Sequence, residues 1–128
     1  MKSISNWLEP FTWEFVTAQN QILCQQKAAH HGPNSDGYLL VKELWEEARL
    51  REMSLFDVID ICRRCHRLAP FTNYNGNTFA AIARIIIRKL NLEPEKEHLV
   101  RSLAGHIVAG VASDKEIQAF QKFCNRLG

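Results

Sequence analysis

The chain has 128 residues, the length of one domain that can bury a hydrophobic core of its own. Hydrophobic residues make up 46%, charged residues 23%, and the net charge is +2, a composition that excludes a disordered chain. The longest apolar stretch, FAAIARIIIRKL, is interrupted by Arg84 and Arg88, so no segment reaches the roughly 20 apolar residues of a membrane span. Because the N-terminus also lacks the pattern of a secretory signal, we expect a cytoplasmic protein without a membrane partner and with reduced cysteines.

Glycine, proline and capping residues divide the chain into helices. The first helix is expected to follow Pro10 and to end at the HHGP of residues 30–33. Its predicted buried stripe is Phe11, Phe15, Ala18, Ile22 and Ala29. After the turn residues GPNSDG, helical spacing predicts a second helix over 38–53. Its predicted core residues are Leu40, Val41, Leu44, Trp45 and Ala48.

Four more helices are predicted in the second half of the chain. Ser54 and Asp57 resemble a capping box that opens LFDVIDICRRCHRL, with Leu55, Val58, Ile59, Cys62 and Cys65 as its apolar stripe. The polar loop APFTNYNGN precedes a helix at TFAAIARIIIRKL, and EPEKEHLVRSLAGHIVAGVA follows with a proline and glutamates in its first turns. Ser113 in SDKE caps a short last helix. No segment predicts a convincing strand, so the expected fold is an all-α, single-domain bundle of five to six helices spanning residues 1–128.

Positive charge is concentrated in residues 61–92. Residues 1–60 have a net charge of −4 and residues 93–128 are balanced, whereas 61–92 contain six cations and no acid. These cations are Arg63, Arg64, Arg67, Arg84, Arg88 and Lys89. Arg63 and Arg67 lie one helical turn apart, as do Arg84 and Arg88, so two packed helices would form a basic groove. Tyr74 and three asparagines lie between them and can stack on or hydrogen-bond a base or sugar. The sequence therefore predicts that these six cations and Tyr74 bind a nucleic-acid backbone.

The arginines could instead pair within the domain, with the acidic second helix as partner. Its carboxylates are Glu43, Glu46, Glu47 and Glu52, and Asp60 can reach Arg64. The protein would then be a protein–protein adaptor whose arginines are only solvated or paired. A helix-turn-helix that reads base sequence is not expected, because the connection over 68–77 is too long for its tight turn.

The stretch CRRCH, residues 62–66, also fits two kinds of metal site. It matches the C-x-x-C-H of covalent haem attachment, and Cys62, Cys65 and His66 could bind zinc together with Cys24, Cys124 or a histidine. Haem attachment belongs to exported proteins, and no second paired-ligand motif follows. The favoured interpretation is that Cys62 and Cys65 are small buried hydrophobes beside three outward arginines. We therefore expect no metal and no cofactor, and an exposed Cys24 without a role.

The stretch RSLAGH matches the R-x4-H pattern of HEPN ribonucleases, a family that is also all-α. Arg101 would bind phosphate and His106 would act as general acid or base. Ser102 departs from the Asn, Asp or His that usually follows the arginine, and a core or interface histidine is the alternative for His106. No other catalytic constellation is present, so a non-catalytic protein is favoured and a HEPN-like ribonuclease is the second alternative.

The helical body and the arginine-bearing helices together show a second resemblance to a known family. The stretch LVKELWEEARLREMSLFDVIDICRRC and the arginine-bearing helices are similar to the small subunit of CRISPR Cascade-type effector complexes, especially the small-subunit-like end of the type I-D large subunit. The resemblance is one of pattern over about half the chain. It implies a non-catalytic bundle that holds RNA or DNA through its phosphates and has protein partners in a multi-subunit assembly, which could include copies of itself.

Overall fold

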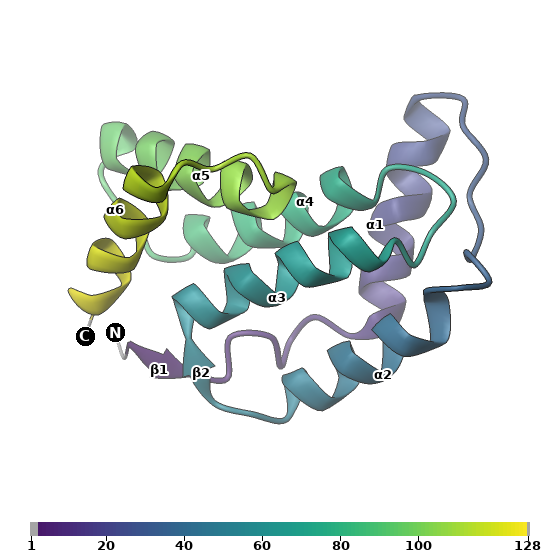
Figure 1. Cartoon of the computed structure of the whole chain (residues 1–128), viewed down its shortest axis with the longest axis horizontal. Coiled ribbons are helices and arrows are strands. Elements are labelled where there is room, and N and C mark those ends of the chain that lie inside the picture. Colours follow the sequence, from purple (N-terminus) through teal and green to yellow (C-terminus); the bar gives the residue numbers. More distant parts are fainter. Residues whose placement is uncertain (1–2, 128) are drawn as a thin grey trace.

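Six helices and two very short strands make up residues 3–127, the part of the chain that the computed structural model describes (Figure 1). The helices are α1 (Trp13–Gln26), α2 (Tyr38–Arg49), α3 (Leu55–Leu68), α4 (Asn75–Arg88), α5 (Pro94–Ala109) and α6 (Asp114–Asn125). The strands β1 (Ile4–Ser5) and β2 (Met53–Ser54) pair antiparallel. The predicted all-α, single-domain bundle is confirmed. The two strands were not predicted, because two residues in each are too few to show an alternating pattern.

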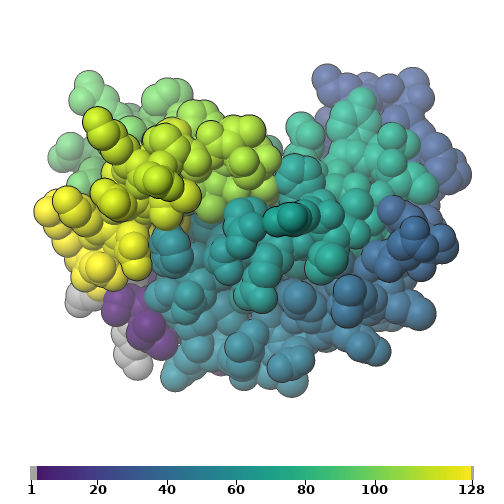
Figure 2. Space-filling model, in the orientation of Figure 1, coloured from purple at the N-terminus to yellow at the C-terminus, as the bar shows by residue number. Residues whose placement is uncertain are grey.

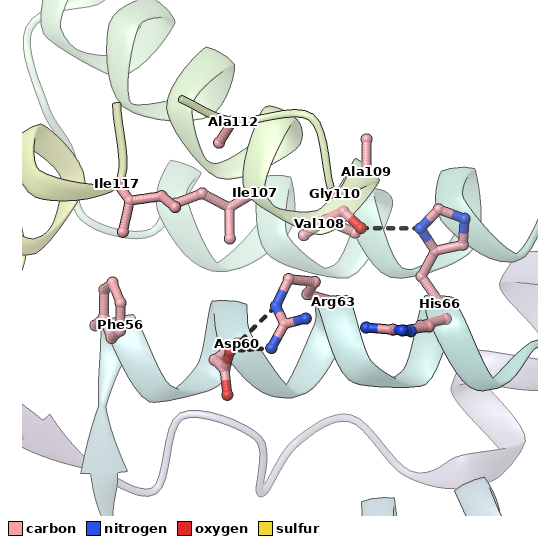
Figure 3. Close-up of a pocket in the computed structure, with 11 residues that line it drawn as sticks. Phe56, Asp60, Arg63, His66, Ile107, Val108, Ala109, Gly110, Ala112 and Ile117 are labelled. Carbon is pink, nitrogen blue, oxygen red and sulfur yellow. Dashed lines mark hydrogen bonds and ion pairs between the residues drawn. The ribbon is translucent and has the colours of Figure 1, made fainter. Parts of the chain in front are cut away.

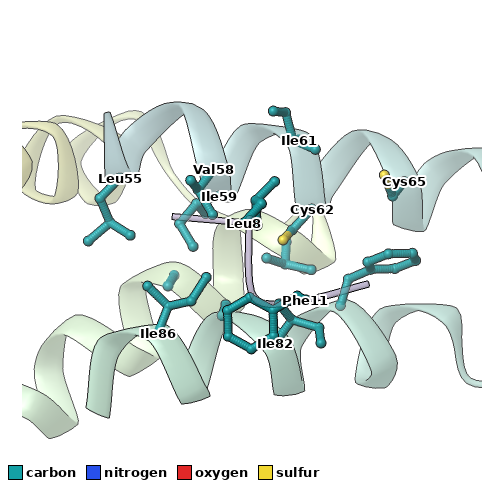
Figure 4. Close-up of a cluster of buried hydrophobic side chains, with 14 of the residues drawn as sticks. Leu8, Phe11, Leu55, Val58, Ile59, Ile61, Cys62, Cys65, Ile82 and Ile86 are labelled. Atoms are coloured by element: carbon teal, nitrogen blue, oxygen red, sulfur yellow. The ribbon is translucent and has the colours of Figure 1, made fainter. Parts of the chain in front are cut away.

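Helix α3 lies at the centre of the bundle and packs against α4, α5 and α6. Its predicted apolar stripe is confirmed, and Ile61 is buried as well. Figure 4 shows Leu55, Ile59 and Cys62 directed toward Ile82 and Ile86 of α4, with Leu8 and Phe11 of the N-terminal segment beside them. Burying each of the larger side chains contributes roughly 1.5–3 kcal/mol, so this interface is a main source of the stability of the fold.

The predicted buried face of the first helix is wrong except for Phe11, which is buried but precedes the helix. Helix α1 buries Trp13, Val16, Asn20 and Cys24, and it leaves Phe15 37% and Ile22 48% exposed. Asn20 is fully buried because its amide donates to the backbone oxygen of Asn73 and to the hydroxyl of Thr78, 2.7 and 3.0 Å away. A search for apolar periodicity passes over a buried face that has a polar residue at its centre. Cys24, expected to be exposed, lies on this face.

Four predicted helix ends differ from the observed ones, and the smallest difference is in α4, which stops at Arg88 rather than at Leu90. Helix α1 stops at Gln26 rather than at the HHGP motif, because Ala28 takes a left-handed φ of 52° and the N–H groups of Ala28 and Ala29 donate to the last turn. Helix α2 stops at Arg49, ahead of the residues that form β2. Of its predicted core residues, Val41, Trp45 and Ala48 are buried, whereas Leu40 is exposed. Helix α5 stops before Gly110, whose φ of 78° is left-handed. Local signals predicted that these helices exist better than they predicted where they end.

Two predicted helix starts are confirmed. The hydroxyl of Ser54 accepts the N–H of Asp57 at the start of α3. Ser113 and Glu116 form a complete capping box at the start of α6, because each side chain accepts the backbone N–H of the other residue. No helix between residues 3 and 127 combines the length and the apolarity needed to cross a bilayer.

Candidate nucleic-acid interface

Two asparagines brace the loop between α3 and α4, Asn73 within it and Asn75 at the first position of α4. The amide of Asn75 donates to the backbone oxygen of Phe71 and accepts its N–H, both at 2.9 Å. Asn73 donates to the backbone oxygen of His30 at 2.9 Å. Two of the three asparagines expected to contact nucleic acid therefore brace the loop. Helix α4 begins at Asn75, earlier than predicted, after Tyr74 turns the chain with a left-handed φ of 58°.

One cavity of about 580 Å³, which we call the apolar groove, lies between α3, the end of α5 and the start of α6 (Figure 3). Phe56 and Ile117 stand at one end of it, and His66 stands at the other, with Arg63 between them. The full lining is Phe56, Asp60, Arg63, His66, Arg67, Ile107, Val108, Ala109, Gly110, Ala112 and Ile117. The groove therefore combines an apolar end with a basic end.

A second cavity of about 610 Å³, which we call the asparagine hollow, lies between the start of α4 and the end of α5. In Figure 2 the surface is hollowed between the yellow-green residues that end α5 and the teal residues of the α3–α4 loop. The lining is His66, Ala69, Thr72, Asn73, Tyr74, Asn75, Gly76, Asn77, Ala80, Arg84, Gly105 and Ala109. No side chain caps the first turn of α4. The positive end of a helix dipole and one arginine therefore face this hollow.

His66 separates the two cavities and lines both of them. Its Nδ1 donates to the backbone oxygen of Val108 at 2.8 Å, so α3 is hydrogen-bonded to the last turn of α5. The imidazole also lies close to Gly76, where a Cβ atom would be 3.0 Å from Cε1 of the ring. The sequence suggested His66 only as a metal ligand, because its role depends on helices that are distant along the chain.

The structure brings four of the seven predicted binding residues to these cavities. Arg63 and Arg67 line the apolar groove, and Tyr74 and Arg84 line the asparagine hollow. Arg64, Arg88 and Lys89 line neither, and the ammonium of Lys89 lies 5.1 Å from the ring centre of Phe11. Helices α3 and α4 pack together, which was the condition for the predicted basic groove, but the end of α5 reaches both cavities. The arginine pairs therefore do not form the single continuous groove that the sequence suggested.

Pairing within the domain satisfies only two of the six cations. Arg63 and Arg64 share the carboxylate of Asp60, at 2.8 and 3.3 Å, so the predicted contact between Asp60 and Arg64 is confirmed. Among residues 3–127, no carboxylate lies within 4.0 Å of the other four cations, which are Arg67, Arg84, Arg88 and Lys89. The acidic helix α2 does not neutralise the basic segment, and its Glu46 pairs with Arg49 instead.

Cys62 and Cys65 are both fully buried, as the favoured interpretation of CRRCH predicted. Burial raises the pKa of the Cys65 thiol to about 12 and raises that of Cys62 well above its usual value. Thiolates rather than thiols bind metals and act as nucleophiles, so this environment opposes both kinds of chemistry. In the described part of the chain, no three His, Cys, Asp or Glu side chains form a group that could hold a metal ion.

Arg101 and His106 are engaged by carboxylates outside both cavities. Arg101 lies 3.6 Å from Glu97, and Nδ1 of His106 is hydrogen-bonded to Glu116 at 2.5 Å. The Glu116 carboxylate accepts the backbone N–H of Ser113 as well, and both contacts hold its pKa below the usual value. His106 is exposed, so it is not a core histidine. The visible role of His106 is therefore a connection between α5 and α6, whereas the contact of Arg101 with Glu97 lies within α5.

No known protein family, characterised protein or solved structure matches the chain. The function is therefore inferred from the charge and geometry of the two cavities and the residues that surround them.

Proposed function

We propose that the protein binds the phosphate backbone of a nucleic acid, without catalysing a reaction, as a subunit of a larger assembly. The observation that carries the proposal is the position of Arg67 and Arg84, which have no carboxylate partner among residues 3–127 and open onto adjoining cavities that share His66. Arg63 adds a cation whose charge is only partly balanced, because Asp60 serves two arginines. Such a cluster attracts polyanions and releases their condensed counterions on binding.

The mode of binding follows from the groups available. Arginine binds phosphate oxygens through a planar fork of N–H donors. The first turn of α4, whose backbone N–H groups no side chain caps, lines the same cavity as Arg84. These groups do not distinguish one base from another, so little sequence specificity is expected. By its resemblance to the Cascade small subunit, the assembly would be a CRISPR effector complex in a cytoplasmic defence system, with RNA or DNA and other subunits as partners.

A second candidate function is a protein–protein adaptor. It is favoured by large apolar side chains that the fold leaves exposed on α1 and α2, namely Phe15, Ile22, Leu39 and Leu40. Such residues can serve as anchors in an interface. The adaptor function predicts a specific protein partner and no salt-dependent binding of nucleic acid. The third candidate, a HEPN-like ribonuclease, predicts RNA cleavage that is lost in His106→Ala.

Fluorescence anisotropy tests the proposal directly. Labelled single-stranded RNA, single-stranded DNA and duplex are titrated with protein at about 50 and 200 mM salt, because phosphate contacts make affinity fall with salt. Reversing both charges in Arg67→Glu/Arg84→Glu should abolish binding without changing the helical circular dichroism. The matched control is Arg51→Glu/Arg126→Glu, which reverses two exposed charges away from both cavities. Equal loss in the two variants, or no binding by the wild type, would contradict the proposal.

A further inference from the structure

The apolar groove differs from the asparagine hollow in having chemically distinct ends. Phe56, Ile107 and Ile117 give it apolar walls, and Figure 3 shows them away from His66. The ring of Phe56 also packs near Phe120, with the two ring centroids 6.3 Å apart. A volume of about 580 Å³ falls within the roughly 300–1,000 Å³ typical of sites that enclose a small organic group. The groove can therefore accept a flat apolar group at one end.

The charge at the other end defines what must be attached to that group. Arg63 shares Asp60 with Arg64, whereas Arg67, one helical turn further along α3, has no carboxylate within 4.0 Å among the described residues. This end is therefore positive. An occupant that complements the whole groove has an anionic part next to an apolar, planar part, and a nucleotide unit combines these two features.

We infer that the apolar groove takes one unstacked base of a single-stranded nucleic acid, with the adjoining phosphate against Arg67. The inference rests on the proposed function and specifies the strand type and how it is held. In a duplex the faces of the bases are stacked and only their edges are accessible, so the apolar walls would stay empty. A single strand can insert a base, and contact between base faces and apolar or aromatic side chains is tolerant of sequence.

The test compares two strands with the same phosphates. One is an oligothymidylate of about 12 nucleotides, and the other has the same length with every base replaced by hydrogen. The wild type should bind the thymidylate about tenfold more tightly than the abasic strand, as expected for one inserted base. Equal affinity for the thymidylate and the abasic strand would overturn the inference, and so would duplex binding as tight as thymidylate binding. In either case, binding that weakens with salt would still support the proposed function. Absence of any binding would overturn both.

A variant that fills the groove locates the base. Ala112 lines the groove, so Ala112→Leu should lower thymidylate binding to the abasic level and leave abasic binding unchanged. Val111→Leu is the control, because Val111 is 70% exposed and lies outside the groove. A preference for the thymidylate that persists in folded Ala112→Leu would overturn the inference, since the base would then lie elsewhere. The comparison of strands with wild-type protein decides the matter even if Ala112→Leu fails to fold. If the strands bind equally, an apolar anion such as octanoate is the next probe of the groove.

Discussion

Neutralising Arg67 and Arg84 together should weaken the salt dependence of nucleic-acid binding by a predictable amount. The two cavities hold three arginines, Arg63, Arg67 and Arg84, so we expect about three phosphate contacts. For a single strand each contact contributes about −0.7 to the slope of log affinity against log salt, which gives a wild-type slope of about −2. Affinity should then fall about 18-fold between about 50 and 200 mM salt. In Arg67→Gln/Arg84→Gln the slope should be about −0.7 and the fall about threefold.

The assay is fluorescence anisotropy at four or more salt concentrations, with a labelled strand present far below its Kd. Arg64→Gln is the matched control, because Arg64 is already paired with Asp60 and lines neither cavity. Its slope should stay close to that of the wild type. An unchanged slope in the double variant, or the same flattening in Arg64→Gln, would refute the assignment of phosphate contacts to the two cavities.

Three further predictions concern the fold. Ala28→Gly should raise Tm by about 4 °C, since glycine relieves roughly 1 kcal/mol of left-handed strain at the end of α1, and an unchanged thermal melt would contradict this. Gly37→Ala should lower the free energy of unfolding by about 2–3 kcal/mol, because the added Cβ would lie 2.2 Å from the backbone oxygen of Leu68. Denaturant titration measures this free energy, and a difference from the wild type that lies within error would count against the packing described. Glu116→Gln should lower Tm at pH 7, because it removes the carboxylate charge that strengthens the hydrogen bonds to Ser113 and His106. Because folding lowers the pKa of Glu116 from 4.5, its contribution is present above that pH and is lost as the pH falls through the lower folded value, so melts of the two proteins should converge in acid. A Tm difference that persists there would argue against the sign of the shift.

The residues of α3 show how much of the fold could be predicted from the sequence. Its apolar stripe, its Ser54 cap and the burial of its two cysteines are all local signals, and each is confirmed. The first helix shows the limit. It has an apolar stripe with Phe15 and Ile22 and a mixed stripe with Asn20. The structure buries the mixed stripe, where the amide of Asn20 is satisfied by Asn73 and Thr78, two residues that are distant in the sequence.

The candidate site divides in the same way. The sequence alone determined the concentration of positive charge in residues 61–92 and the absence of acids among them, because charge is a property of composition. Tertiary structure decided which cations act together. Asp60 takes Arg63 and Arg64, while the end of α5 and the hydrogen bond from His66 to Val108 complete two adjoining cavities that Arg67 and Arg84 line. The pairs with Asp60 are local contacts, but the cavities depend on residues more than 40 positions apart, 66 and 108 among them. No local periodicity records which distant helix end will lie against a given side chain.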